Sequence, residues 1–495
     1  MRQQRTIYFN DARHYYLFVF EPPMALEDAW VPVDEVAGTA VDTFAYGVER
    51  GDGLFYPSRV GLRFGADMQP FPMAAYWRVW HNMQSLMDRG LDPLQVLVDR
   101  AHAKGMDFIA SLRMGGYGGM DPAHRLDKGG RGLAHAEVRD HIFAVLRELA
   151  TEYPVEGVEL DLATPGGSPY LLPPEEGPAM CPVLTDYVAQ ISDMVRGRPG
   201  EPGTVGARVL PTEEMNLAQG LDVRAWLERG LVDFVVPLRY GYMILDPHMP
   251  IDWLVEAAHR ADAAVYAMLQ PYMHDESSAA PERLYPTPAQ MRAAVASYWA
   301  RGVDGIYTWF MRWPLGDVER RILTELGDPD LVRRGDKHYV LARRAPNLDR
   351  VPYPAPLPVE IPACDVGTRH PIPFYLADAV DGPESRVRQV RLRVLIRDLV
   401  CADRIALWLN GQSLAGEACW RDHGSQVAPY VGQWLELSLG QVRPRQGDNV
   451  LEVSLEARPA GLASALAVEQ VEVLVEYSAY PTGPGAAEVP HNPSR

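Results

Sequence analysis

Short apolar runs alternate with amphipathic stretches over the first 345 or so residues of the chain. The stretches between the runs, such as 93–105 and 288–302, carry apolar residues at spacings of three and four, which indicates helices. We expect eight strands, at residues 14–20, 41–48, 106–114, 155–163, 206–211, 231–238, 263–271 and 303–311. Eight such repeats without a sheet-reversing interruption favour an α/β fold, a closed (β/α)8 TIM barrel over 1–345, rather than an open doubly wound sheet.

The pattern changes after the expected barrel. Residues 342–363 contain six prolines and few helix formers, so we expect an extended linker over 346–365. From 366 to 480, apolar and polar side chains alternate with period two, and turn sequences such as Asn410-Gly411 separate the runs. This alternation predicts an antiparallel β-sandwich, followed by a disordered tail at 481–495.

The composition is that of a globular protein, with 47% hydrophobic and 23% charged residues. Asp and Glu number 65 against 47 Lys and Arg, which gives a net charge of −18. The sequence contains no run of basic residues that would form a positive patch. Such a surface repels phosphate backbones, which argues against nucleic-acid partners. No window reaches the ~18 apolar residues of a membrane helix, and the first 16 residues lack the apolar segment of an export signal. As the sequence stands we expect a cytoplasmic protein without membrane partners, and the pattern leaves a homo-oligomer open.

The strand expected at 155–163 carries the sharpest chemical signal. Val158 and Leu160 alternate there with Glu159 and Asp161, so the two carboxylates share one face of the strand. If the apolar pair packs on helices, both acids lie inside the barrel, where unpaired charges are costly. Asp161, nearer the carboxyl end of the strand, is the better candidate for catalysis. Glu159 either supports catalysis or pairs with an interior arginine, such as Arg113 or Arg208, as scaffolding.

A second acidic pair, Glu213-Glu214, follows the next expected strand. Glycoside hydrolysis requires two carboxyl groups on either side of the scissile bond, one acid and one nucleophile or base. Glu214, or less favourably Glu213, therefore becomes the candidate general acid opposite Asp161. The alternative is that this pair is a solvated surface dipeptide.

Other expected strand ends combine aromatic and polar side chains. A pocket of this kind suits a carbohydrate substrate, because sugars present both apolar C–H faces and hydroxyl groups. For any single aromatic residue, packing at the rim is an equal alternative. The candidate substrate-binding residues are Arg113, Tyr117, Arg239, Tyr240, Tyr242, Gln270, Tyr272, His274, Trp309 and Arg312.

Motifs for cofactors and metals are absent from the sequence. No GxGxxG motif follows a strand, and neither an HExxH pair nor a GxSxG elbow occurs. His274 and its acidic neighbours offer one or two metal ligands, but a solvated loop is favoured there. The four cysteines are too scattered for a disulfide framework, although Cys401 and Cys419 would be able to pair in an exported protein. We expect neither a cofactor nor a metal.

Several stretches are similar to a known family. RTIYFND, YPSRVGLRFG, EGVELDLA and GLDVRAWLERGLVDFVVP resemble bacterial family 10 glycosyl hydrolase-like barrel proteins. Residues 386–477 resemble the β-sandwich appended to many carbohydrate-active enzymes. The resemblance implies action on glycosidic bonds in polysaccharide degradation, with Asp161 as the fourth-strand acid, Glu159 behind it and Glu214 as the fifth-strand acid. The chain departs from the family at Gly115-Gly116-Tyr117, where relatives carry an Asn-Asp-type polar stretch.

These patterns lead to one main hypothesis, a glycoside hydrolase that cleaves an oligosaccharide or glycoside by a two-carboxylate mechanism. Two alternatives remain open at this stage. One is a barrel that binds sugar without catalysis, and the other is a metal-dependent lyase or isomerase on the same fold.

Overall fold

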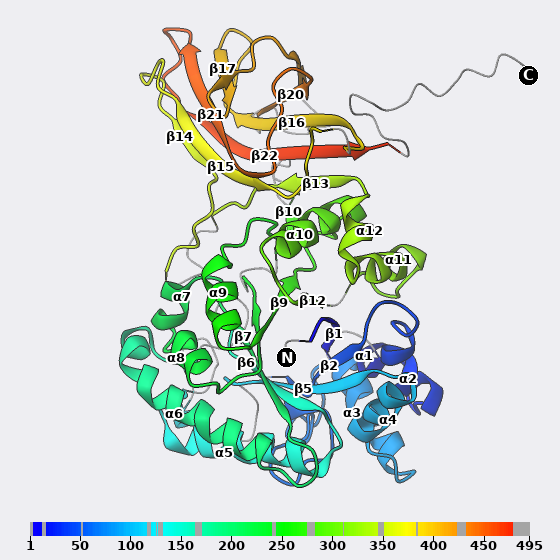
Figure 1. Ribbon diagram of the computed structural model, residues 1–495. Coiled ribbons are helices and arrows are strands. Elements are labelled where there is room, and N and C mark those ends of the chain that lie inside the picture. Colours follow the sequence, from blue (N-terminus) through cyan, green and yellow to red (C-terminus); the bar gives the residue numbers. More distant parts are fainter. Residues whose placement is uncertain are drawn as a thin grey trace, which may run out of the picture.

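A computed structural model describes residues 3–11, 16–50, 53–115, 120–124, 126, 132–163, 171–239, 244–274, 283–309, 311–344, 351–382, 385–422 and 432–478. The chain forms two domains, an α/β barrel and a β-sandwich that lies beside its outer helices (Figure 1). All cysteines are free thiols, and Cys181 is the buried one. Among the described helices, none combines the length and hydropathy needed to cross a bilayer. The expected tail at 481–495 lies outside the described residues.

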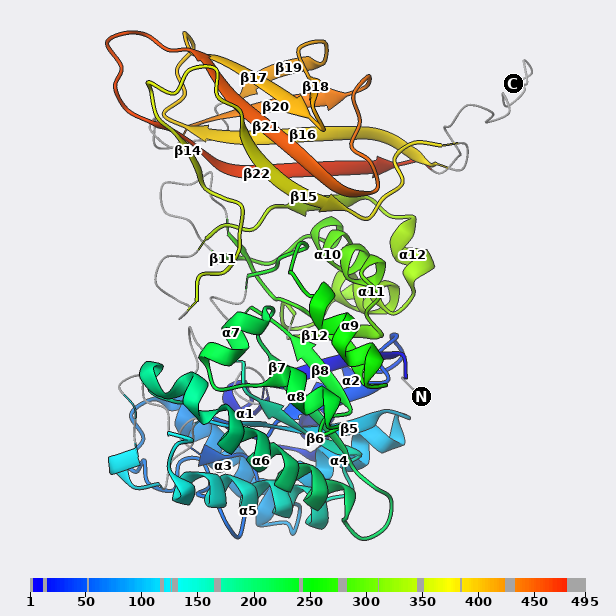
Figure 2. The ribbon, with the colours of Figure 1, turned by 60° about the vertical axis from the view of Figure 1, so that its left-hand side comes forward.

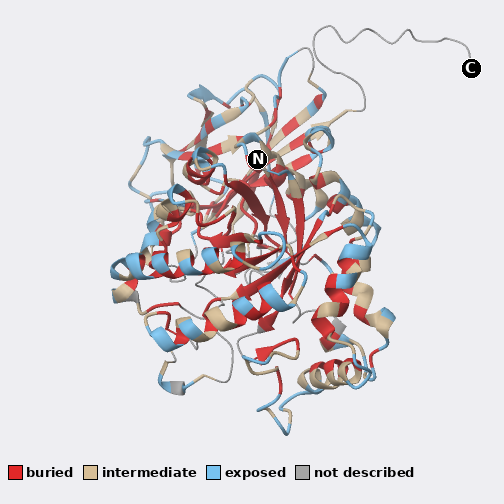
Figure 3. Cartoon of the chain, turned by 60° about the horizontal axis from the view of Figure 1, so that its bottom comes forward, coloured by how far each residue is buried: buried red, intermediate tan, exposed pale blue. Residues whose placement is uncertain are grey.

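The first domain is a closed barrel of eight parallel strands, as predicted. The two ends of the sheet meet where Arg5 pairs with Gly305, so the barrel closes between its first and last strands. Figure 3 shows the strands as a buried centre inside a ring of helices that are buried on one side only. In barrel order the strands are β1 (Arg5–Asp11), β12 (Gly305–Thr308), β9 (Ala264–Leu269), β8 (Phe234–Pro237), β7 (Thr204–Val209), β6 (Gly157–Asp161), β5 (Asp107–Arg113) and β2 (Thr43–Gly47).

The first expected strand was wrong. Residues 16–20 do not pair in the barrel, because 16–19 form the short helix α1 (Tyr16–Val19), and the first strand is β1 instead. Residues 14 and 15 lie outside the described residues. Phe18 of this run packs against the rings of Phe55, Phe64 and Tyr76, outside the barrel. A short apolar, aromatic run has the same composition whether it is a strand or a buried helix turn, so periodicity did not separate the two.

The helices cover the outside of the barrel and bury their apolar faces on the strands. α10 begins after Thr287, whose hydroxyl accepts a hydrogen bond from the Gln290 amide and closes a capping box. The remaining helices are α2 (Leu26–Asp34), α3 (Ala74–Met87), α4 (Pro93–Ala103), α5 (Ala136–Glu152), α6 (Gly177–Arg196), α7 (Glu213–Ala218), α8 (Val223–Glu228), α9 (Asp252–Arg260), α10 (Pro288–Ala300), α11 (Asp317–Leu326) and α12 (Pro329–Arg333).

The second domain is an antiparallel sandwich of two sheets, as predicted (Figure 2). Its apolar side chains form a core of their own between the sheets. One sheet has the order β13 (Lys337–Val340), β22 (Leu466–Tyr477), β16 (Val387–Arg397), β20 (Gln433–Leu439) and β19 (Ala418–Asp422), with β14 (Val359–Ile361) also on β22. The other has the order β15 (His370–Leu376), β21 (Gly447–Ala457), β17 (Arg404–Leu409) and β18 (Gln412–Ser413).

Two strands of the sandwich come from segments expected to be barrel and linker. β13 precedes residue 345 and β14 lies within 346–365, yet both pair with β22 more than 100 residues later in the chain. Lys337 of β13 is buried in an ion pair with Asp378 at 2.9 Å, and the Tyr339 hydroxyl donates to the same carboxylate at 2.6 Å. The sandwich therefore begins at β13. The four residues KHYV do not reveal this alone, because their partner strand is remote in sequence.

Glu35, which caps the C-terminus of α2, makes the stability of the fold depend on pH. Burial raises the pKa of its carboxyl from 4.5 to about 8, although hydrogen bonds from Tyr8 and Trp313 act in the opposite direction. The folded protein therefore holds this proton at pH values where the unfolded chain has released it. The free energy of unfolding is expected to fall as pH rises from about 4.5 to about 8 and then to level off.

Glutamine at position 35 carries no titratable proton, so the Glu35→Gln variant should lose this component of the pH dependence. Urea unfolding of both proteins at several pH values between about 5 and 8.5 measures it. Identical slopes against pH in the wild type and the variant would contradict the assignment.

Candidate functional site

Strand β6 directs its two carboxylates into the barrel, as its alternation predicts. Val158 and Leu160 pack in the apolar layer between strands and helices. Glu159 and Asp161 lie on the opposite face, with 0% and 2% of their surfaces exposed. Asp161 is the last residue of the strand, so it lies at the carboxyl end of the barrel, where (β/α)8 enzymes place their reacting groups.

Glu159 belongs to a buried network that crosses the barrel interior. Its Oε1 accepts from Nε of Arg208 at 2.7 Å, from the Ser111 hydroxyl at 2.7 Å and from the Tyr307 hydroxyl at 3.1 Å. The guanidinium of Arg208 also donates to the Tyr307 hydroxyl at 2.7 Å and lies 3.8 Å from the centre of the Phe9 ring. This is the scaffolding arrangement, in which an interior arginine holds the carboxylate.

The charges in this network depend on each other. Burial raises the pKa of Glu159, and Arg208 offsets part of that increase. Burial alone would lower the pKa of Arg208, but Glu159, Tyr307 and Asp161 outweigh it and hold the pKa above its usual value. Arg208 is therefore a permanent cation at the centre of the barrel, and its side chain is 0% exposed.

Asp161 has a different environment from Glu159. Its Oδ2 lies 3.5 Å from Nη1 of Arg208 and 3.7 Å from Nε of Arg113, which are ion-pair distances. Neither oxygen accepts a hydrogen bond from the part of the chain that the structure describes. Buried polar atoms in native proteins are nearly always satisfied, so these oxygens are available to water or to a bound molecule.

Two further carboxyl groups lie beside Asp161, and neither was predicted from the sequence. Nη2 of Arg113 binds Oδ2 of Asp11 at 2.8 Å, so this guanidinium contacts the last residues of both β1 and β6. Glu49, two residues after the end of β2, is 1% exposed. Burial raises its pKa well above the usual value, Arg113 partly offsets this, and the charges of Asp11 and Asp161 add to the increase.

The signal for Asp11 was present in the sequence. It closes the run RTIYFND, which is β1, but the first strand was assigned to residues 14–20 and its carboxyl end was therefore sought in the wrong place. Glu49 had no comparable signal, because it follows a strand that carries no carboxylate. β1, β2, β5 and β6 are consecutive in the barrel, and this is why Asp11, Glu49, Arg113 and Asp161 meet. We call these four residues the acidic cluster.

Glu213 and Glu214 lie apart from this interior network, in the first turn of α7. Glu213 forms a two-bond ion pair with Arg224, with distances of 2.5 and 2.8 Å, and the pair lowers its pKa. Glu214 is exposed. The surface position of Glu213 agrees with the alternative interpretation, a solvated acidic dipeptide. The role of Glu214 as an acid stays a prediction.

The other expected binding residues are dispersed. Gln270, Trp309 and Arg312 line one small cavity between the strand ends and α10–α11, but Trp309 is completely buried, and Arg312 is exposed. Tyr272 packs against Tyr285, and His274 lies in the two-residue strand β10 (Met273–His274). Tyr117, Tyr240 and Tyr242 lie outside the described residues.

Arg239 contacts the linker rather than the acidic cluster. Its guanidinium lies 4.2 Å from the centre of the Tyr353 ring and donates to the Arg343 carbonyl at 3.1 Å. Tyr353 is buried and its hydroxyl donates to Asp246. The linker therefore packs on residues that follow β8, whereas the acidic cluster lies at the ends of β1, β2, β5 and β6.

No family model matches the chain, and no curated protein is similar to it in sequence. An α-L-fucosidase isoenzyme 2 from Paenibacillus thiaminolyticus is 12% identical, with a TM-score of 0.42 over 66% of this chain and 48% of the fucosidase. The chain thus spans about half the length of that enzyme. An α-L-fucosidase from Vibrio sp. strain EJY3 is 11% identical, with a TM-score of 0.41 over 95% of this chain and 96% of that enzyme.

A β-1,4-mannanase is also 11% identical, with a TM-score of 0.38 over 66% of this chain and 99% of the mannanase. TM-scores this low carry no argument about substrate or catalytic residues. The resemblance to family 10 glycosyl hydrolase-like proteins stays a prediction.

Proposed function

We propose that the protein is a glycoside hydrolase whose catalytic groups belong to the acidic cluster. The observation that carries this proposal is the meeting of three carboxyl groups, those of Asp11, Glu49 and Asp161, around the guanidinium of Arg113. They lie at the carboxyl ends of neighbouring strands, which is where barrel enzymes hold their substrates. Cleavage of a glycosidic bond requires one carboxyl group that is protonated and another that is ionised.

Asp161 is the proposed nucleophile or base. Its oxygens face two guanidinium groups at 3.5 and 3.7 Å and carry no hydrogen bond from the described residues. A carboxylate in this position keeps lone pairs for an anomeric carbon or for a water molecule. Arg208, held in place by Glu159, is a positioning residue for Asp161.

The general acid is the second part of the mechanism. The sequence pointed to Glu214, which is exposed on α7. Glu49 meets the chemical requirement better, because burial and the neighbouring negative charges raise the pKa of its carboxyl. A carboxylic acid that keeps its proton near neutral pH is able to protonate the leaving-group oxygen. We therefore assign the acid role to Glu49 and retain Glu214→Gln as the comparison.

Glu49→Gln is expected to lower kcat by roughly 10²–10⁴-fold on glycosides with poor leaving groups. Aryl glycosides with acidic phenols need little protonation, so their cleavage should change much less. The raised pKa of Glu49 means that activity falls as pH rises through that pKa, and this alkaline limb should vanish in the variant. Glu214→Gln should behave as wild type, and the reverse pattern would transfer the acid role to Glu214.

A panel of aryl glycosides and natural oligosaccharides, assayed with the wild-type protein, tests the function itself. Hydrolysis that releases a reducing sugar from at least one substrate supports the proposal. Glycan affinity without cleavage anywhere on the panel would indicate a sugar-binding barrel instead. An unsaturated or isomerised product, in place of a hydrolysed one, would indicate the lyase or isomerase alternative.

A further inference from the structure

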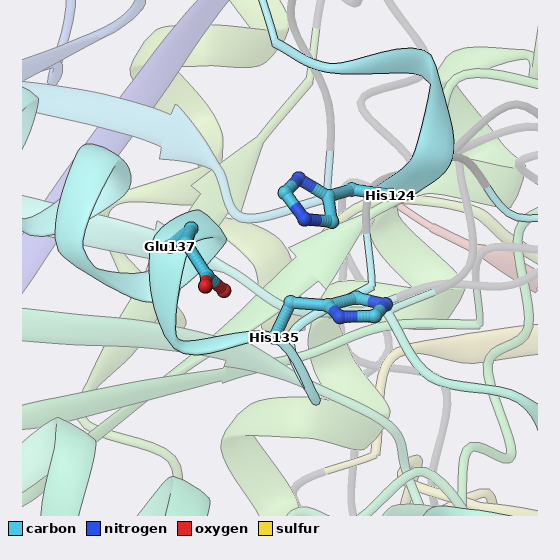
Figure 4. A group of neighbouring side chains, drawn as sticks. All are labelled: His124, His135 and Glu137. Carbon is cyan, nitrogen blue, oxygen red and sulfur yellow. The ribbon is translucent and has the colours of Figure 1, made fainter.

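Three side chains with metal-binding chemistry meet in the segment between β5 and α5. They are His124, at the end of a short 3₁₀ helix (Pro122–His124), His135, directly before α5, and Glu137, in the first turn of α5. One ligand atom from each lies within 4.8 Å of the other two. Figure 4 shows the two imidazole rings and the carboxylate gathered in one place. The sequence spacing did not predict this group, because ten residues separate the two histidines.

We propose that His124, His135 and Glu137 bind a divalent transition-metal ion, with Zn²⁺ as the best match. Two imidazoles and one carboxylate form a common zinc ligand set, which leaves a fourth tetrahedral position for water. Imidazole ligands favour zinc and its neighbours in the first transition row over Mg²⁺ or Ca²⁺, which prefer all-oxygen sites.

The surroundings of the two histidines support this assignment. The imidazole rings lie with their centres 4.6 Å apart and their planes 39° apart. Nδ1 of His124 is buried and forms no hydrogen bond with the residues that the structure describes. His135 occupies the N-cap position of α5, yet its side chain makes no capping hydrogen bond within the described chain. A ring nitrogen without a protein partner is what a metal site requires.

The backbone around the group is held in place. Nη1 of Arg139 donates to the carbonyls of Leu133 and Ala134 at 2.7 and 2.9 Å. The amide of Gly132 donates to the His124 carbonyl at 3.0 Å, which joins the two ends of the segment. Tetrahedral zinc ligands lie roughly 3.3 Å apart, so binding has to draw the three atoms together. His135 and Glu137 are exposed and have room to rotate.

The proposed ion has a consequence for the barrel mouth. The segment that contains it follows β5, whose last residue is Arg113 of the acidic cluster. The Leu133 amide donates to the Leu171 carbonyl at 2.7 Å, and Leu171 belongs to the segment that follows β6 and Asp161. A bound ion would therefore hold the described part of the β5–α5 connection, which the Leu133 hydrogen bond already joins to the segment after β6. Its role is to order this rim, and the hydrolytic step is not routed through it.

Calorimetric titration of ZnCl₂ into full-length protein, after treatment with EDTA and dialysis, tests the site. The wild type is expected to bind one Zn²⁺ per chain. His124→Ala, His135→Ala and Glu137→Gln should each weaken binding by about tenfold or more. His102→Ala is the matched control, because this imidazole also lies beside a carboxylate, 3.1 Å from Glu156, and the described residues supply no third ligand there.

Cobalt provides a second, spectroscopic measurement that does not depend on activity. Co²⁺ should give the visible absorption of a four-coordinate site in the wild type and in His102→Ala, and lose it in the double variant His124→Ala/His135→Ala. Circular dichroism without metal confirms that each variant is folded. Zinc affinity in the double variant equal to that of the wild type, or no stoichiometric binding by the wild type, would overturn the proposal. Either result leaves the glycosidase assay unaffected.

Discussion

Replacing Asp161 with Asn is expected to abolish turnover and leave the fold intact. Asparagine has nearly the same shape, but its amide neither attacks an anomeric carbon nor deprotonates water. For a nucleophile or base the loss in kcat should be roughly 10⁴-fold or more. The fold should survive because Asp161 accepts no hydrogen bond from the described residues, while Arg208 and Arg113 retain their shorter contacts with Glu159 and Asp11.

The measurement is kcat on the best substrate from the glycoside panel, together with a thermal melt of the variant. Asp186→Asn is a suitable control, because Asp186 is an exposed aspartate of α6 that pairs with Arg229 at 3.5 Å, outside the barrel interior. It should retain full activity. Wild-type turnover by Asp161→Asn would exclude this residue as nucleophile or base.

The largest effect on stability is expected from Arg208→Met. The side chains of Arg208 and Glu159 are both 0% exposed, so removal of the cation leaves a buried carboxylate with only neutral donors. Breaking a buried ion pair from one side costs about 3–5 kcal/mol of unfolding free energy. Methionine fills much of the same volume beside Phe9, which limits the contribution of a cavity to the loss.

Denaturant unfolding of Arg208→Met, Glu159→Leu and the double variant measures the effect. The double variant should be more stable than the sum of the single losses predicts, because it leaves no uncompensated charge. Arg229→Leu, which breaks the exposed pair with Asp186, should cost less than about 1 kcal/mol. Equal small losses in Arg208→Met and Arg229→Leu would show that the interior pair does not hold the barrel together.

Features of the site that depend on local sequence were predicted correctly, and features that depend on contacts between distant strands were missed. The inward direction of Glu159 and Asp161 followed from the two-residue period of β6, which is a local property. Arg113 and Arg208 were named as examples of an interior partner for Glu159, and Arg208 is the one that binds it. Glu49 was missed because its raised pKa comes from burial beside Asp11 and Asp161, which lie on other strands.

The same contrast applies to the fold. Seven of the eight barrel strands, the closed barrel and the sandwich were predicted from periodicity. The first strand was missed because the periodicity of a short aromatic run does not distinguish a strand from a helix. The placement of β13 in the sandwich was not predicted either, because its partner strand β22 is remote in the sequence.

The order of apolar and polar residues by itself determined the two architectures and the direction of the β6 carboxylates, because these depend on repeats of two to four residues. Tertiary structure alone decided which carboxyl groups surround Arg113, where the linker packs, and which histidines meet before α5. These depend on contacts between residues far apart in the chain, where burial and neighbouring charge set the chemistry.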